Sequence, residues 1–237
     1  MDTISLIDNI NRVNERIYKA ALKAGRDPQS IALLLATKTR TPALINQAIE
    51  LGYGLIGENR AQELVEKAPH LLKTETTITP RETHFIGALQ GNKVNEVTAF
   101  ADCIQSVDRT RIARRIHQYA LDNGIQKSIM IQVNSSRDPN KQGVLPEDLP
   151  QFLTDIAAFS TLTIKGLMTI GLQSDDESII RKGFSDLRTL QESMITRELL
   201  PKNATELSMG MSQDLELAIL EGSTILRVGS DIFGQRI

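Results

Sequence analysis

The sequence alternates eight times between a short apolar run and a stretch with helical spacing of its apolar residues. The apolar runs, typical of strands buried on both faces, lie near residues 31–37, 53–57, 83–87, 103–107, 128–133, 162–170, 205–209 and 224–228. Helical patterns separate them, near residues 42–51, 59–72, 91–100, 108–122, 146–158, 174–196 and 212–221. Eight strand–helix repeats in 237 residues predict a single (β/α)8 TIM barrel. The rival is an open doubly wound sheet, which usually has fewer strands and a glycine-rich first turn that is absent here.

An additional helix is predicted in front of the barrel. Apolar residues recur at helical spacing over residues 3–24, and Gly25 ends the pattern. This helix either packs on the barrel or mediates dimers, and we expect a monomer with at most weak dimerisation. No linker rich in proline, glycine or serine divides the chain, so residues 1–237 are expected to form one domain.

The composition excludes several classes of protein. The formal net charge is −2, aromatic residues make up 4% of the chain and tryptophan is absent, so no surface for nucleic acid is expected. No apolar run approaches the roughly 18 residues of a membrane span, and the N-terminus lacks the apolar core of a signal peptide. The single cysteine, Cys103, can form no internal disulfide. We therefore expect a cytoplasmic protein without membrane contact.

Chemistry in such a barrel takes place at the C-terminal ends of the strands. Lys38 ends the most apolar run, where its amine is either partly desolvated and nucleophilic or simply extended into solvent. Residues 227–231 close the last strand, where barrels often bind phosphate, although a simple turn is an equal interpretation. None of the three histidines, His70, His84 and His117, has metal-ligand spacing, so no metal site is expected.

A second candidate phosphate contact follows the seventh strand. Ser208 and Ser212 flank a glycine there, and small hydroxylated residues beside glycine suit a phosphate. An ordinary strand-to-helix turn with Ser212 as the helix N-cap is the alternative, and the two roles are compatible.

Sequence blocks along nearly the whole chain resemble those of a known family. The chain is similar to the pyridoxal phosphate homeostasis proteins, which are barrels of the alanine racemase type. Each block alone is weakly specific, but together, in the family's order and spacing, they are highly specific. The matching blocks are ATKT at 36–39, GENR at 57–60, HFIG at 84–87, LQGNK at 89–93, IQSVD at 104–108, QVN at 132–134, KQG at 141–143, GLM at 166–168, LSMGMS at 207–212 and RVGSDIFG at 227–234.

The resemblance implies a cofactor, pyridoxal 5′-phosphate (PLP), and a role for each matching residue. It implies a Schiff base between PLP and Lys38 and places Arg227 against the pyridine nitrogen. It places the cofactor phosphate on Ser208, Gly229 and Ser230, although many family members have threonine at position 230. Residues 135–140 depart from the family's glycine-containing loop, which leaves that loop's contacts open. Around the cofactor ring the resemblance places Asn59, His84, Met168 and Met209.

Three functions are open: a PLP-binding protein of intracellular PLP homeostasis and amino-acid balance that acts without efficient turnover, a PLP-dependent racemase, and a barrel enzyme for another phosphorylated metabolite. Racemisation needs an acid or base on each face of the substrate α-carbon. Lys38 could serve one face, but Tyr18, Tyr53 and Tyr119 are expected away from the chemical face, and the chain has no room for the second domain of alanine racemases. We therefore favour the non-catalytic protein, with no catalytic residue, and with free amino acids and PLP-dependent apo-enzymes as candidate partners.

Overall fold

Eight parallel strands form a closed barrel in the order of the chain. The computed structural model describes residues 3–73, 79–172 and 174–234. Strand β1 pairs with β8 from Ala32↔Ile225 to Leu35↔Val228, which closes the sheet. The strands are β1 Ala32–Ala36, β2 Leu55–Glu58, β3 Glu82–Phe85, β4 Cys103–Val107, β5 Lys127–Gln132, β6 Leu162–Met168, β7 Glu206–Ser208 and β8 Ile225–Val228. The predicted (β/α)8 barrel is confirmed.

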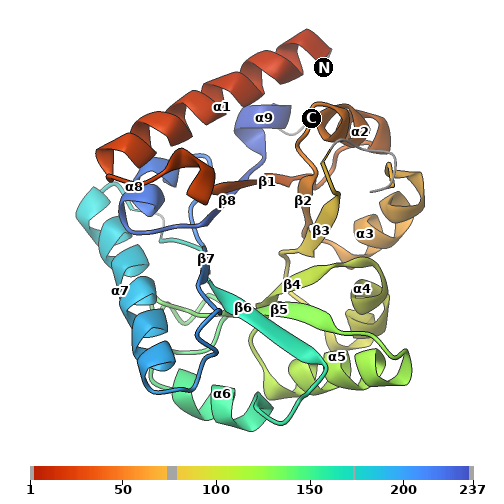
Figure 1. Cartoon of the computed structure of the whole chain (residues 1–237), viewed down its shortest axis with the longest axis vertical. Coiled ribbons are helices and arrows are strands. Elements are labelled where there is room, and N and C mark those ends of the chain that lie inside the picture. Colours follow the sequence, from red (N-terminus) through yellow and green to blue (C-terminus); the bar gives the residue numbers. More distant parts are fainter. Residues whose placement is uncertain (1–2, 74–78, 173, 235–237) are drawn as a thin grey trace.

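Helices lie between successive strands and surround the barrel (Figure 1). The predicted helix 59–72 ends early as an α-helix, because Pro69 lacks the amide hydrogen that would continue it. The helix predicted near residues 174–196 begins at Glu177, because Asp176 is the N-cap and accepts from Ser178 N. The α-helices are α2 Pro42–Glu50, α3 Ala61–Lys67, α4 Val94–Phe100, α5 Thr110–Asp122, α6 Leu149–Ile156, α7 Glu177–Thr196, α8 Leu215–Leu220 and α9 Ser230–Phe233, and the 3-10 helices are η1 Pro28–Ser30, η2 Ala68–His70 and η4 Gly91–Lys93.

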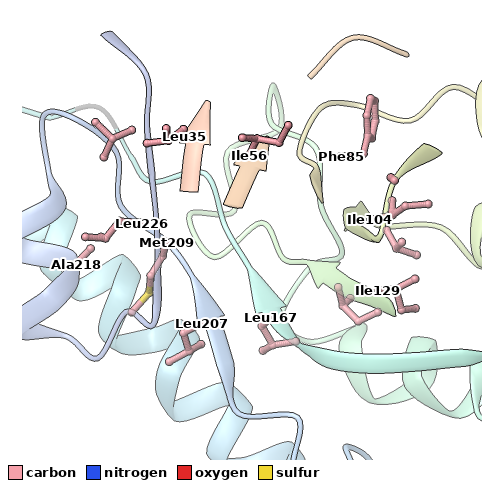
Figure 2. Close-up of a cluster of buried hydrophobic side chains, with 14 of the residues drawn as sticks. Leu35, Ile56, Phe85, Ile104, Ile129, Leu167, Leu207, Met209, Ala218 and Leu226 are labelled. Carbon is pink, nitrogen blue, oxygen red and sulfur yellow. The ribbon is translucent and has the colours of Figure 1, made fainter. Parts of the chain in front are cut away.

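Two apolar cores follow from the alternation of side chains along each strand. The larger core lies between the barrel and its helices, and every strand contributes to it, from Leu35 of β1 to Leu226 of β8 (Figure 2). The smaller core fills the barrel with the side chains of Leu34, Cys103, Met130, Met168 and Ile225. Cys103 is 1% exposed, as the sequence indicated for a small core residue, and burial raises the pKa of its thiol.

Helix α1, Thr3–Lys23, packs against α8 and α9 of its own barrel (Figure 1). Its apolar face is buried there, with Leu6, Ile10, Val13 and Ile17 all at most 5% exposed. The sequence left open whether this helix packs on the barrel or mediates dimers. In the structure it packs on the barrel. No helix in the described ranges has the length and apolar character that crossing a membrane requires.

Candidate functional site

The backbone on both sides of Lys38 is fixed by one buried cluster of charges. Lys38 follows β1, and Lys67 of α3 donates from Nζ to the carbonyl oxygen of Thr37 at 2.9 Å. On the other side, the amide of Thr39 donates to Oε2 of Glu63 at 2.6 Å. Thr39 has φ 63°, an uncommon conformation for a residue with a side chain, and these contacts hold the turn in place. The cluster therefore orients the segment that carries the candidate nucleophile.

The cluster is a buried network of one lysine and two glutamates. Lys67 Nζ lies 2.7 Å from Oε1 of Glu58 and 2.8 Å from Oε2 of Glu63. Burial raises the pKa of Glu58, against the opposing hydrogen bonds from Lys67 and Thr37. Burial would also raise the pKa of Glu63, but the bonds from Lys67 and the Thr39 amide outweigh it and lower the pKa. Lys67 is thus the cation on which the Lys38 turn depends.

Asn59 follows β2 and presents a buried amide oxygen at the same end of the barrel. Its Oδ1 has no hydrogen-bond partner among the described residues. Gly87, after β3, allows its backbone to pass close by, because a Cβ there would lie 2.0 Å from the carbonyl oxygen of Asn59. A buried acceptor without a donor is costly, so this position suits a polar ligand group.

Ser212 and Ser230 bring two hydroxyls together after β7 and β8. Their Oγ atoms are 3.1 Å apart, and Ser230 begins the short helix α9, whose first-turn amides have no partner within that helix. Gly229 precedes it, and a Cβ there would lie 3.0 Å from the carbonyl oxygen of Ala36 at the end of β1. Ser212 does not cap α8 as one interpretation had it, since α8 begins at Leu215 after Asp214. These groups form a hydroxyl pair suited to an anion.

Arg16 of α1 joins the two loops that carry this hydroxyl pair. Its guanidinium donates to the carbonyl oxygen of Ser212 at 2.8 Å and to Oδ2 of Asp231 at 2.6 Å. It also binds Glu216 of α8, with Nε to Oε1 at 2.6 Å. Helix α1 therefore stabilises the two loops of the candidate anion site from outside the barrel.

Arg227 is a buried cation inside the mouth of the barrel. Its Nη1 donates to the carbonyl oxygen and to Oγ of Ser208, both at 2.7 Å, and its Nη2 donates to the carbonyl oxygen of Thr169 at 2.7 Å. These three bonds use only the two Nη atoms of the guanidinium. Burial lowers the pKa of Arg227 to about 10, so the group is still protonated at neutral pH.

Two of the predicted site residues, Ser208 and His84, are hydrogen-bonded to other side chains inside the barrel. Ser208 is fully buried, and its hydroxyl donates to Oε1 of Gln105 at 2.6 Å, so its proton is not available to a phosphate. His84 is 3% exposed inside the barrel, where Nε2 lies 2.8 Å from Oε1 of Glu82 and Nδ1 lies 2.6 Å from Nε2 of Gln105. A place for the His84 imidazole beside a ligand ring at the mouth is therefore not supported.

The two predicted methionines lie on opposite faces of the barrel wall. Met209 has its side chain in the outer core together with Leu226 and Ala218 (Figure 2), so this side chain cannot contact a ligand ring inside the barrel. Met168 lies in the inner core with Leu34 and Met130, at the end of β6. Only Met168 is thus placed to form an apolar floor below the mouth.

Sequence reasoning missed three residues that build this site: Lys67, Gln105 and Arg16. Gln105 stands in the block IQSVD, which was the available signal for it. Lys67 and Arg16 lie in helices, where nothing in the sequence marks them as partners of the loops.

The described part of the chain contains no group of three or more histidine, cysteine or carboxylate side chains placed to hold a metal ion. The three tyrosines, which are all described, lie away from the mouth, as expected. Tyr18 is 54% exposed on α1, Tyr53 precedes β2 and accepts from Asn14 Nδ2 at 2.6 Å, and Tyr119 lies on α5. No tyrosine is therefore available as an acid or base beside Lys38.

Comparison with known proteins identifies the family of the chain. The family model "Alanine racemase, N-terminal domain" matches residues 37–237, so the fold and site define a barrel of the alanine racemase type. A pyridoxal phosphate homeostasis protein of Aquifex aeolicus is 38% identical over 232 residues, which cover 97% of each chain. The chain belongs to the pyridoxal phosphate homeostasis protein family.

Two solved structures extend the comparison. PipY of Synechococcus elongatus, solved with PLP bound, is 31% identical, with a TM-score of 0.78 over 94% of this chain and 100% of that one. An alanine racemase of Clostridium difficile has a TM-score of 0.76 at 10% identity and covers 98% of this chain and 60% of its own. At 10% identity, the match to the alanine racemase supports a similar fold only.

Proposed function

We propose that this protein binds PLP as a Schiff base on Lys38, takes part in intracellular PLP homeostasis and does not turn over amino acids efficiently. The observation that carries the proposal is the buried Arg227, whose two Nη atoms are fixed by oxygens of Ser208 and Thr169, so that Nε is the N–H we propose for the cofactor ring. A neutral pyridine nitrogen is an acceptor that fits this donor. The PLP bound to a relative of similar fold and 31% identity supports the same conclusion.

The residues of the site fit the other parts of the cofactor as well. PLP supplies an aldehyde, which condenses with a lysine amine with loss of water, and an electron-poor ring. Lys38 would provide the amine, Asn59 a partner for a ring substituent, and Met168 an apolar floor. The hydroxyls of Ser212 and Ser230, with Gly229 and the first amides of α9, would bind the phosphate. We assign the phosphate to Ser212 in place of Ser208, whose proton is donated to Gln105.

Removing the hydroxyl pair should release the phosphate. The double change Ser212→Ala with Ser230→Ala deletes two donors to a group with nearly two negative charges. A lost charge-assisted hydrogen bond costs about 1.5–3 kcal/mol, so PLP affinity should fall roughly ten- to a hundredfold or more, as measured by equilibrium dialysis. The double change Ser185→Ala with Ser193→Ala on α7 is the matched control and should not alter affinity. Equal retention of PLP by both variants would remove Ser212 and Ser230 from the site.

Two features of the site oppose efficient turnover. Arginine acts only as a donor, so Arg227 favours the unprotonated ring, a weaker electron sink than a pyridinium. Alanine racemases work with the same arrangement, so the second feature has more weight. No tyrosine lies at the mouth to protonate the α-carbon on the face opposite Lys38.

Slow racemisation is therefore the expected result with L-alanine. Each positioned acid or base typically contributes ~10²–10⁴-fold, so the rate should be at least about a hundredfold below that of a dedicated racemase. The purified protein loaded with PLP is incubated with L-alanine in deuterated water, and α-proton exchange and D-alanine are both followed. Rapid formation of D-alanine that is lost in Lys38→Ala would establish the racemase as the function instead.

We further propose that the protein is a cytoplasmic monomer, with free amino acids and PLP-dependent apo-enzymes as its partners. The buried thiol of Cys103 and the packing of α1 on its own barrel agree with this picture.

A further inference from the structure

A continuous chain of side-chain hydrogen bonds runs through the interior of the barrel from Arg227 to Glu82. Arg227 Nη1 donates to Oγ of Ser208 at 2.7 Å, and that hydroxyl donates to Oε1 of Gln105 at 2.6 Å. The amide nitrogen of Gln105 lies 2.6 Å from Nδ1 of His84, and Nε2 of His84 lies 2.8 Å from Oε1 of Glu82. The chain connects strands β8, β7, β4 and β3 across the barrel.

The donor and acceptor groups of these side chains give the series of hydrogen bonds one direction, from Arg227 to Glu82. Arginine can only donate, so the Ser208 hydroxyl accepts from Arg227, and this hydroxyl donates its own proton to the Gln105 carbonyl oxygen. The amide of Gln105 therefore presents its N–H₂ to His84, whose Nδ1 accepts. The other ring nitrogen, Nε2, then donates to Oε1 of Glu82. Each bond thus polarises the next in the same sense.

Carboxylate charge at the far end of the chain supports this direction. The hydrogen bond from His84 lowers the pKa of Glu82, and Lys165 of β6 contributes to the same effect. Glu206 of β7 faces the same groups from across the barrel. Gln105 is fully buried and stands at the middle of the chain, with both ends of its amide used. In this orientation the amide oxygen accepts from Ser208 and the amide nitrogen faces Nδ1 of His84.

We propose that Gln105 is a positioning residue, which fixes the Ser208 hydroxyl and through it the orientation in which Arg227 offers Nε to the cofactor ring. This inference rests on the proposed binding of PLP. It assigns Ser208 and His84 to the support of Arg227, in place of the direct cofactor contacts expected from the sequence. Gln105 belongs to the block IQSVD at 104–108, which contributes no proposed cofactor contact. The inference gives this block a role in positioning Arg227.

Two substitutions at position 105 separate positioning from mere packing. Gln105→Leu keeps the approximate volume but removes both hydrogen bonds, and PLP affinity should fall about three- to thirtyfold. Gln105→Glu keeps an acceptor for the Ser208 hydroxyl, so affinity should return to within about threefold of the wild type. The carboxylate cannot donate to Nδ1, so His84 must then carry a proton on both ring nitrogens. Ser106→Ala, a neighbouring buried position, is the matched control.

The readouts are PLP affinity by equilibrium dialysis, the visible spectrum of the bound cofactor, and nitrogen-15 NMR of labelled histidine in the PLP-free protein. We expect Nδ1 of His84 to accept a hydrogen bond, and so to carry no proton, in the wild type and in Ser106→Ala, and to carry a proton in Gln105→Glu. Equal weakening by Gln105→Leu and Gln105→Glu, or none by Gln105→Leu, would overturn the inference while leaving PLP binding intact. A wild-type protein that binds no PLP would overturn the proposed function, and the NMR result would still report on the chain of hydrogen bonds.

Discussion

Lys38→Ala should abolish the visible absorption of a PLP Schiff base while leaving the fold intact. Lys38 lies just after β1, at the rim of the barrel and outside both apolar cores. Its removal deletes the only amine proposed to react with the cofactor aldehyde. A substitution outside the core usually changes stability by no more than about 0.5 kcal/mol, so the thermal unfolding midpoint should stay near that of the wild type.

The matched control for this change is Lys93→Ala. Lys93 ends η4 on a neighbouring loop and pairs with Glu96 at 3.0 Å, so its loss should leave the absorption unchanged. Noncovalent PLP should still bind weakly to Lys38→Ala through the proposed phosphate contacts. An undiminished Schiff base spectrum in Lys38→Ala would show that another lysine holds the cofactor.

Lys67→Met should produce the largest loss of stability among single changes near the site. Lys67 is 8% exposed and Glu58 2%, and the change leaves two carboxylates facing each other without their cation. Breaking a buried ion pair in this way typically costs about 3–5 kcal/mol of the free energy of unfolding. The change also removes the hydrogen bond from Lys67 to the Thr37 carbonyl and frees Glu63, which binds the Thr39 amide. The Lys38 turn is then less well fixed, so Schiff base formation should become slower. Denaturant unfolding and stopped-flow absorbance measure the two effects.

Lys182→Met provides the comparison for a solvent-exposed lysine. Lys182 is 74% exposed on α7 and pairs with Asp186, an arrangement that usually contributes little. The expected change in the free energy of unfolding is within about 0.5 kcal/mol. A loss of less than about 1 kcal/mol in Lys67→Met would mean that Glu58 is accommodated without its partner.

The barrel could be predicted because hydrophobic periodicity reports directly on burial. A strand covered on both faces must be apolar throughout, and the run at 31–37 is a clear case. Boundaries were less certain, since α7 begins after Asp176 and not near residue 174, and Pro69 divides the predicted helix 59–72. Such details depend on which of several suitable side chains reaches the first free amide.

The site was predicted less completely, for physical reasons that particular residues illustrate. Ser208 and Met209 are adjacent on an extended segment, so their side chains point to opposite faces and cannot both contact one ligand. Alternation alone could have excluded one of them. The partnership of Ser208 with Gln105 joins residues 103 positions apart, and local sequence contains no signal for such a contact. The same holds for Arg16 and the Ser212 carbonyl, which are 196 positions apart.

Mapping the attachment point of PLP on the wild-type protein tests the central claim most directly. The protein is loaded with PLP, reduced with borohydride to fix any Schiff base, digested and analysed by mass spectrometry. The proposed function predicts a single modified peptide, with the reduced cofactor on Lys38. Modification of a different lysine, or none on a protein that retains PLP through dialysis, would contradict it.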